Sequence, residues 1–106
     1  MEISPNQLLE RINAGTAPTI LDVRSAWEYR RGHVPGAIHL PFWTLEGRVS
    51  DIPGSIDDPI VVYCGHGPRA WMAGAALRRH GFRHVMYLNG HMHGWRRSCL
   101  PEEDER

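Results

Sequence analysis

Short apolar runs alternate with stretches of helical spacing along this 106-residue chain. Four runs rich in aliphatic and β-branched residues are bounded by glycine, proline or polar residues, and they predict buried strands. These runs lie at 19–23, 37–40, 60–63 and 84–88. The run at 60–63 has the purest apolar character of the four, which is typical of a central strand covered on both faces.

Helical spacing and cap residues predict five helices between and beside these strands. They lie at 5–13, just after Ser25, and at 42–52, 69–80 and 92–97. Ser4 is expected to cap the first helix and Pro5 to begin it. The helix at 69–80 carries Ala70, Ala73 and Gly74 on one face, so it is expected to lie close on the sheet. Strands that alternate with helices favour an α/β fold with a parallel sheet covered by helices on both faces.

The length and composition of the chain indicate one compact domain, assigned to residues 1–100, followed by an acidic tail at 101–106 that is expected to be frayed. Twelve basic and twelve acidic residues cancel, so nothing in the charge favours a nucleic-acid partner. No apolar run approaches the ~18 residues of a membrane span, and the start lacks a signal-peptide pattern. We therefore expect a cytoplasmic protein with no membrane or nucleic-acid partner.

Cys64 opens the stretch with the clearest chemical signal, a loop between the strand at 60–63 and the helix that follows. Gly65 and Gly67 can both take positive φ, so the loop can turn its N–H groups inward. The helix start adds its positive dipole end, and both effects favour a thiolate. Pro68 begins the helix and is expected to hold Gly67 in an extended conformation. It has no N–H, so the candidate donors to the sulfur are Gly65, His66, Gly67, Arg69 and Ala70.

Neither cysteine belongs to a disulfide framework, because the chain has only Cys64 and Cys99, far apart in sequence. A cysteine at a strand end is more often a small buried hydrophobic residue than a nucleophile. The two glycines and the helix begun by proline shift that balance toward a nucleophile. A metal site is not expected, since His84, His91 and His93 lack the spacing of metal ligands.

Several motifs occur together in an order that resembles one protein family. The sequence contains Leu21-Asp22-Val23-Arg24, Glu28-Tyr29, Gly32-His33-Val34-Pro35-Gly36-Ala37-Ile38, Val62-Tyr63-Cys64 with its six-residue loop, Leu88-Asn89-Gly90, Gly94-Trp95 and Leu100-Pro101. Across nearly the whole chain this pattern is similar to that of the single-domain rhodaneses, or sulfurtransferases. The resemblance implies the rhodanese-like α/β fold, with a central, mostly parallel five-stranded sheet.

The resemblance also implies an activity. A sulfane sulfur would pass from a donor such as thiosulfate to cyanide or a thiol through a persulfide on Cys64, with no cofactor. One alternative is a persulfide carrier that docks to a thiol-bearing protein without turnover. Another is a phosphatase or arsenate reductase, but phosphatases of related fold have five residues between cysteine and arginine, and here there are four. The smaller ring of amide groups favours a sulfur atom.

The sequence also departs from the family pattern. Gly65 stands where many members have a second basic residue, which leaves His66 and Arg69 as the only cations of the loop. A strongly anionic donor is therefore not implied. The Gly-Gly pair that the family has after its last strand appears here as Gly90-His91, and Cys99 stands where glycine is common.

The remaining candidates are supporting residues. Asp22 and Arg24 are expected to pair and brace the neighbouring loop, and Arg69 to orient an anionic donor. His66 is expected to line the pocket. Glu28 and His33 are interpreted as structural. Three tryptophans, Trp43, Trp71 and Trp95, are expected either to line the pocket or to belong to the core. The core is favoured for Trp95.

Overall fold

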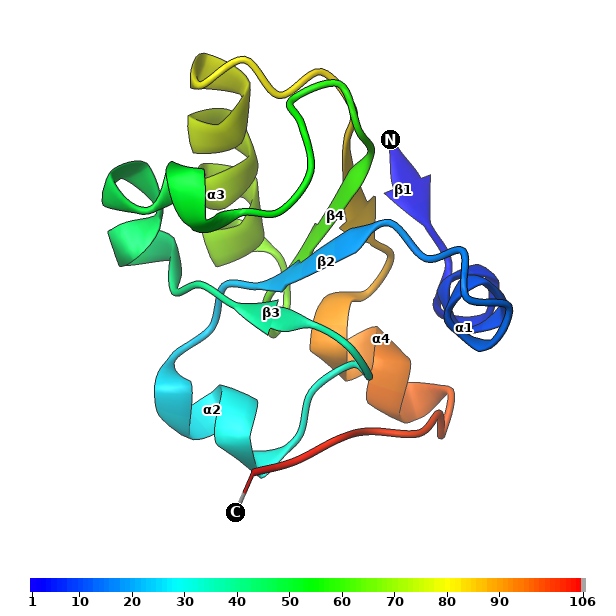
Figure 1. The fold of residues 1–106 in the computed structure, drawn as a ribbon. Helices are drawn as coiled ribbons and strands as arrows, with labels where there is room; N and C mark the ends of the chain where they lie inside the picture. Colours follow the sequence, from blue (N-terminus) through cyan, green and yellow to red (C-terminus); the bar gives the residue numbers. More distant parts are fainter. Residues whose placement is uncertain (106) are drawn as a thin grey trace.

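Strand β4 (Ile60–Tyr63) lies at the centre of the structure, and all four of its residues are buried. In this computed structural model, which describes residues 1–105, five strands form one sheet in the order β1-β5-β4-β2-β3 (Figure 1). Every neighbouring pair is parallel. The other strands are β1 (Glu2–Ile3), β2 (Thr19–Asp22), β3 (Ile38–His39) and β5 (Val85–Leu88). The predicted α/β fold and five-stranded sheet are confirmed.

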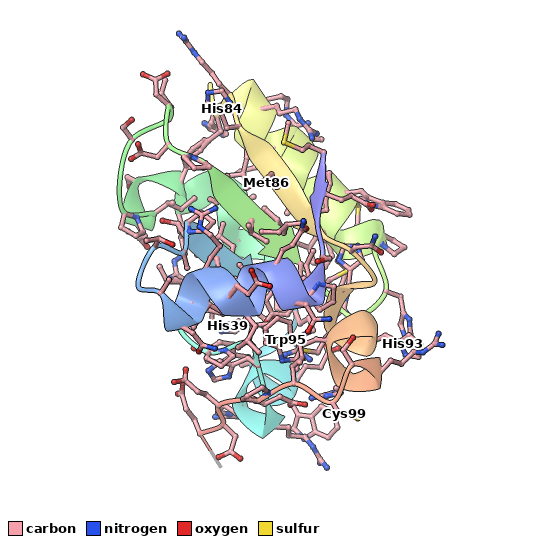
Figure 2. The ribbon with its side chains drawn as sticks, turned by 90° about the vertical axis from the view of Figure 1, so that its right-hand side faces the viewer. His39, His84, Met86, His93, Trp95 and Cys99 are labelled. Atoms are coloured by element: carbon pink, nitrogen blue, oxygen red, sulfur yellow. The ribbon has the colours of Figure 1, made fainter. Side chains whose placement is uncertain are left out.

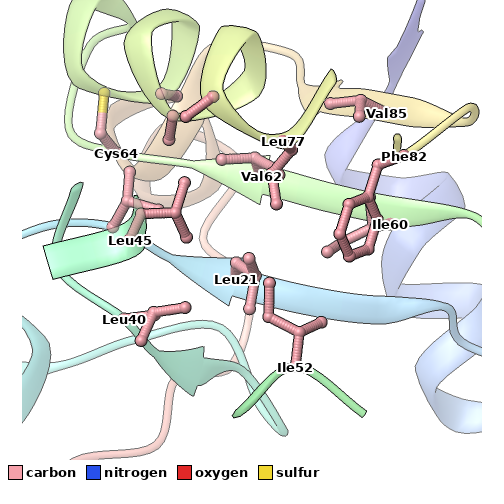
Figure 3. Packing of buried hydrophobic residues seen from close by; sticks show 14 residues of the cluster. Leu21, Leu40, Leu45, Ile52, Ile60, Val62, Cys64, Leu77, Phe82 and Val85 are labelled. Atoms are coloured by element: carbon pink, nitrogen blue, oxygen red, sulfur yellow. The ribbon is translucent and has the colours of Figure 1, made fainter. Parts of the chain in front are cut away.

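Helices cover both faces of the sheet, and alternate residues of each strand point to opposite faces. Leu21 and Val62 belong to the core beneath α3 (Pro68–Arg79), which Figure 3 shows. Ile20 and Val61 belong to a second core on the other face. Helices α1 (Pro5–Asn13) and α4 (His91–Arg97) close that second face (Figure 1). Helix α2 (Ala26–Arg31) follows β2.

Local sequence accounts for how the main helices begin and pack. Ser4 and Gln7 form a reciprocal capping box at the start of α1, and Pro5 is its first residue, as predicted. On α3, Gly74 lies so close to the Tyr87 hydroxyl that a Cβ at this position would overlap it. The predicted face of small residues thus lets α3 approach β5.

Two predicted segments differ in the structure. Residues 42–52 are not one α-helix: they contain two short 3-10 helices, Phe42–Gly47 and Val49–Asp51, with the weak helix former Gly47 at the end of the first and no side-chain cap on either. Strand β1 was not predicted, since two residues are too few to show a period. It exists because Glu2 and Ile3 pair with the edge of β5.

The acidic tail is bonded rather than frayed, so that expectation is wrong for residues 101–105; Arg106 lies outside the described residues. Glu103 exchanges two backbone hydrogen bonds with His33, of 2.8 and 2.9 Å. The Trp95 Nε1–H donates to the Pro101 carbonyl over 2.8 Å, and Glu102 pairs with Arg96. His33 is remote from Glu103 in sequence, which is why composition alone did not predict that the tail is held in place. Within residues 1–105, no helix has the length and apolar character to span a membrane.

Candidate active site

The Cys64 loop joins the carboxyl end of β4 to the start of α3. Cys64 is fully buried, and its sulfur points toward α3 (Figure 3). Pro68 is the first residue of α3, as predicted, but Gly67 is not extended: its φ is 140° and its ψ is −49°. Of the two loop glycines only Gly67 has positive φ. A side chain at this position would also meet the Trp71 ring, with its Cβ 2.9 Å from that ring, so the turn requires glycine.

The sulfur of Cys64 is held by groups that favour its ionised form. The Gly67 N–H donates to Sγ over 3.0 Å. Burial opposes ionisation, but hydrogen bonds with the His91 side chain and with the Ala70 and Gly67 N–H groups outweigh it, and they lower the pKa of the Cys64 thiol from 9.0 to about 7. Of the five predicted amide donors, Gly67 and Ala70 are the ones that act on the sulfur. A substantial fraction of Cys64 is therefore thiolate at neutral pH.

The side chain of Arg69 forms a bidentate ion pair with Glu28. The two guanidinium nitrogens lie 2.6 and 3.1 Å from the carboxylate oxygens. This pair, against the opposing effect of partial burial, lowers the pKa of Glu28 to about 2. Glu28 also receives hydrogen bonds from Ser25 at the start of α2. The structural role predicted for Glu28 thus includes fixing the guanidinium of Arg69 beside the Cys64 loop.

Asp22 and Arg24 form the predicted pair, and they are almost completely buried at the end of β2. Arg24 Nη2 lies 2.7 Å from Asp22 Oδ2 and also donates to the Gly32 carbonyl over 2.7 Å. The Tyr63 hydroxyl donates to the same Asp22 carboxylate over 2.7 Å and accepts the Val34 N–H over 3.0 Å. Burial raises the pKa of Tyr63 well above its usual value, so the phenol remains a neutral donor. This network connects the end of β4, directly before Cys64, to the segment after α2.

The start of α4 is hydrogen-bonded to the loop, a contact that the sequence did not predict. The Met92 N–H donates to the Cys64 carbonyl over 2.9 Å, and the His93 N–H donates to the Gly65 carbonyl over 3.1 Å. The Cys64 N–H in turn donates to His91 Nδ1 over 3.2 Å. His91 is buried, and the sequence marked it only as a rejected metal ligand and as a departure from the family pattern.

A cavity of about 420 Å³ opens beside the loop. Its lining residues are Arg24, Glu28, Gly65, His66, Arg69, Met92, His93, Arg96 and Arg97. The His66 and His93 rings lie 5.0 Å apart between centroids. Four arginines face one carboxylate here, so α4 and the end of β2 supply cations that the loop sequence alone lacks. His66 lies in the pocket lining, where the sequence placed it.

The remaining candidates lie outside this cavity. Trp95 is completely buried in the core, whereas Trp43 and Trp71 are largely exposed and do not line the cavity. The His33 ring stacks on Tyr29 with 3.7 Å between centroids, in keeping with a structural role. Figure 2 shows His84 near the top of the view and His93 on the right-hand side below the middle, well separated from it. Within residues 1–105, no group of three or more histidine, cysteine, aspartate or glutamate side chains is arranged to hold a metal ion.

Comparison with known proteins gives a consistent result. Residues 4–98 match the rhodanese-like domain family. The chain is 33% identical over 100 residues to a sulfurtransferase of Allochromatium vinosum, covering 94% of this chain and 92% of that protein. It is 32% identical over 102 residues to the thiosulfate sulfurtransferase GlpE of Actinobacillus pleuropneumoniae, covering 96% and 92%.

Longer relatives and solved structures complete the comparison. The chain is 31% identical over 94 residues to YrkF of Bacillus subtilis, a protein named for sulfur carriage; the match covers 89% of this chain but only half of that protein. Among solved structures, the Alr3790 protein of Anabaena superposes with a TM-score of 0.86 at 33% identity, covering 96% of this chain and 81% of that one.

Proposed function

The chain belongs to the rhodanese-like family of sulfurtransferases, and from that premise we propose that it moves a sulfane sulfur from thiosulfate to cyanide or a thiol through a persulfide on Cys64. The observation that carries the proposal is the arrangement around the Cys64 sulfur. The Gly67 N–H at 3.0 Å and a thiol pKa of about 7, reached despite burial, describe a nucleophile that is substantially ionised at neutral pH.

The reaction is a double displacement on one sulfur atom. The Cys64 thiolate attacks the outer sulfur of thiosulfate, a Cys64–sulfur bond forms, and sulfite leaves with the electron pair of the broken sulfur–sulfur bond. Cyanide then attacks the outer sulfur of the persulfide, and thiocyanate leaves as the Cys64 thiolate is regenerated. Each step places negative charge at the loop, where the N–H groups of Gly67 and Ala70 stabilise it.

The charged residues that line the cavity favour binding of an anionic sulfur donor more strongly than the residues of the Cys64 loop alone do. Arg69 is neutralised in part by Glu28, and Arg96 by Glu102. Arg97 also lines the cavity, and among the described residues it makes no ion pair. The cavity therefore keeps a positive charge that would attract thiosulfate despite the missing basic residue at position 65.

Mass spectrometry of the intact protein tests the proposal. Thiosulfate should add one sulfur atom to the wild type and to Cys99→Ser but none to Cys64→Ser, and cyanide should remove the added sulfur as thiocyanate. Sulfur on Cys99, or turnover in Cys64→Ser, would contradict the mechanism. A persulfide that forms but passes to a protein thiol and not to cyanide would identify a carrier, the function for which YrkF is named.

A further inference from the structure

His91 has an unusual backbone for a residue with a side chain. Its φ is 55°, in the left-handed region, and it follows Gly90 directly at the start of α4. A Cβ is disfavoured in this region, and such strain persists where the surrounding structure requires it, often at functional sites. His91 is also only 4% exposed, so its ring is enclosed by the protein. A buried, strained histidine in contact with the candidate nucleophile calls for a role.

The contacts of the ring supply that role. Nδ1 accepts the Cys64 N–H over 3.2 Å, which gives a buried amide its partner. An imidazole that accepts at Nδ1 and is neutral carries its proton on Nε2, so this contact selects one tautomer. The Trp71 ring, 6.5 Å away between centroids and nearly perpendicular, packs near the imidazole. The histidine is therefore held in place from both the loop and α3.

The adjacent backbone bonds make this contact part of a larger attachment. The N–H groups of Met92 and His93, in the first turn of α4, donate to the carbonyls of Cys64 and Gly65. Helix N–H groups in this position have no partner within their own helix. Three neighbouring hydrogen bonds thus join residues 91–93 to residues 64–65. Two of them are between backbone groups, and the third is accepted by the His91 side chain.

We propose that His91 is a positioning residue for the Cys64 nucleophile: its ring holds the Cys64 N–H and keeps the sulfur aligned with the N–H groups at the start of α3. The charged and titratable groups that face the sulfur are His91 from α4 and Arg69 from α3, with Glu28 from α2 behind Arg69. Among the effects that lower the pKa of the Cys64 thiol, that of the His91 side chain is the largest. The proposal rests on Cys64 being the nucleophile of the proposed function.

The test measures alkylation of Cys64 by iodoacetamide between pH 5 and 10, with no sulfur donor present. Cys99→Gly is the background, because it removes the other thiol and relieves the same backbone strain, a φ of 55°, at an exposed site. In that background His91→Gly should move the midpoint of the alkylation profile up from about 7. A rise of about one pH unit lowers the rate at pH 7 about fivefold.

A second variant separates positioning from folding. His91→Asn places an amide oxygen where Nδ1 accepts the Cys64 N–H, and asparagine tolerates left-handed φ. It should restore part of the midpoint shift. A midpoint that stays unchanged in His91→Gly would overturn the proposal, whatever happens to the melting temperature, because a purely structural role would alter stability without altering ionisation.

Failure of the His91 proposal can be distinguished from failure of the proposed function. If His91→Gly shifts the alkylation midpoint but thiosulfate never loads Cys64, the positioning role holds and the donor is wrong. If thiosulfate loads Cys64 normally and the midpoint does not move, the proposed function holds and the inference about His91 fails.

Discussion

Cys64 and Cys99 are the same side chain in opposite surroundings. Cys64 is fully buried at the end of the central strand, with hydrogen bonds to its sulfur from one side and to its backbone from the other. Cys99 is exposed just beyond the end of α4, where Figure 2 shows it near the surface, and within the described residues its sulfur has no hydrogen bond. Exposure alone would rank Cys99 as the reactive thiol.

The difference teaches that polar surroundings, rather than exposure, favour ionisation of a thiol, and on this ground we propose Cys64 and not Cys99 as the nucleophile. The Cys64 loop turns N–H groups toward the sulfur and places Arg69 nearby, and both favour negative charge there. The following changes test which parts of its surroundings set Cys64 apart from Cys99.

The largest effect is expected from the buried pair beneath the loop. Asp22→Asn removes the carboxylate that neutralises Arg24 and accepts the Tyr63 hydroxyl, and it leaves a buried charge without its partner. We expect a loss of about 3 kcal/mol in the free energy of unfolding. Urea denaturation measures it. The matched control is Asp51→Asn, which breaks an exposed pair with Arg48 and should cost about 0.5 kcal/mol or less. Equal losses would contradict the bracing role.

The ionisation of Cys64 should make stability depend on pH. Its pKa is lower in the folded protein, about 7, than the ordinary value of 9.0. The resulting stabilisation is fully present above pH 9 and is lost as the pH falls through 7. It amounts to about 3 kcal/mol.

Urea denaturation from pH 5 to 9.5 checks this prediction. Cys64→Ser should lose this part of the pH dependence, and Cys99→Ser, which leaves Cys64 intact, should retain it. Parallel curves for Cys64→Ser and the wild type would show that the thiol is not ionised in the folded protein.

Gly67→Ala should reduce the reactivity of Cys64 while leaving Cys99 as an internal reference. Alanine at position 67 would have to adopt a φ of 140°, which a residue with a side chain rarely does, and its Cβ would lie 2.9 Å from the Trp71 ring. The backbone must therefore shift, and with it the N–H that donates to Sγ. We expect alkylation of Cys64 to slow about tenfold, which corresponds to the loss of roughly one charge-assisted hydrogen bond. Peptide mapping resolves the two thiols.

Gly65→Ala is the matched control for this change. Gly65 has no positive φ, and a Cβ there meets only the flexible end of Arg69 at 3.2 Å. Its effect on Cys64 alkylation should be much smaller than that of Gly67→Ala. Similar rates for the two variants would mean that the conformation of Gly67 does not matter.

The smallest effect is expected from adding charge. Gly65→Arg places a second cation beside Arg69, whose guanidinium must move by a few tenths of an ångström. We expect kcat/KM with thiosulfate to rise about threefold and to become more sensitive to salt, with little change for an uncharged sulfane donor. Gly65→Gln controls for side-chain size. The same change with both donors would show that electrostatic attraction does not limit the reaction.

Much of this protein was predictable from the sequence, because its determinants are local. Four strands followed from apolar runs, and the start of α1 followed from Ser4 and Pro5. The position of Cys64 at a strand end, followed by a helix that begins at Pro68, followed from neighbouring residues alone. Even the pairing of Asp22 with Arg24 joins residues two apart. Such interactions depend on backbone preferences within a few residues, which a sequence states directly.

What only the tertiary structure decided lies between residues far apart in the chain. Glu28 meets Arg69 across 41 positions, and His91 meets Cys64 across 27. Before the order of strands is known, no local rule says that the start of α4 borders the end of β4. The sequence by itself determined that Cys64 lies in a loop fit for a thiolate. The tertiary structure determined which distant side chains surround it, because packing of the sheet brings the ends of parallel strands to one edge.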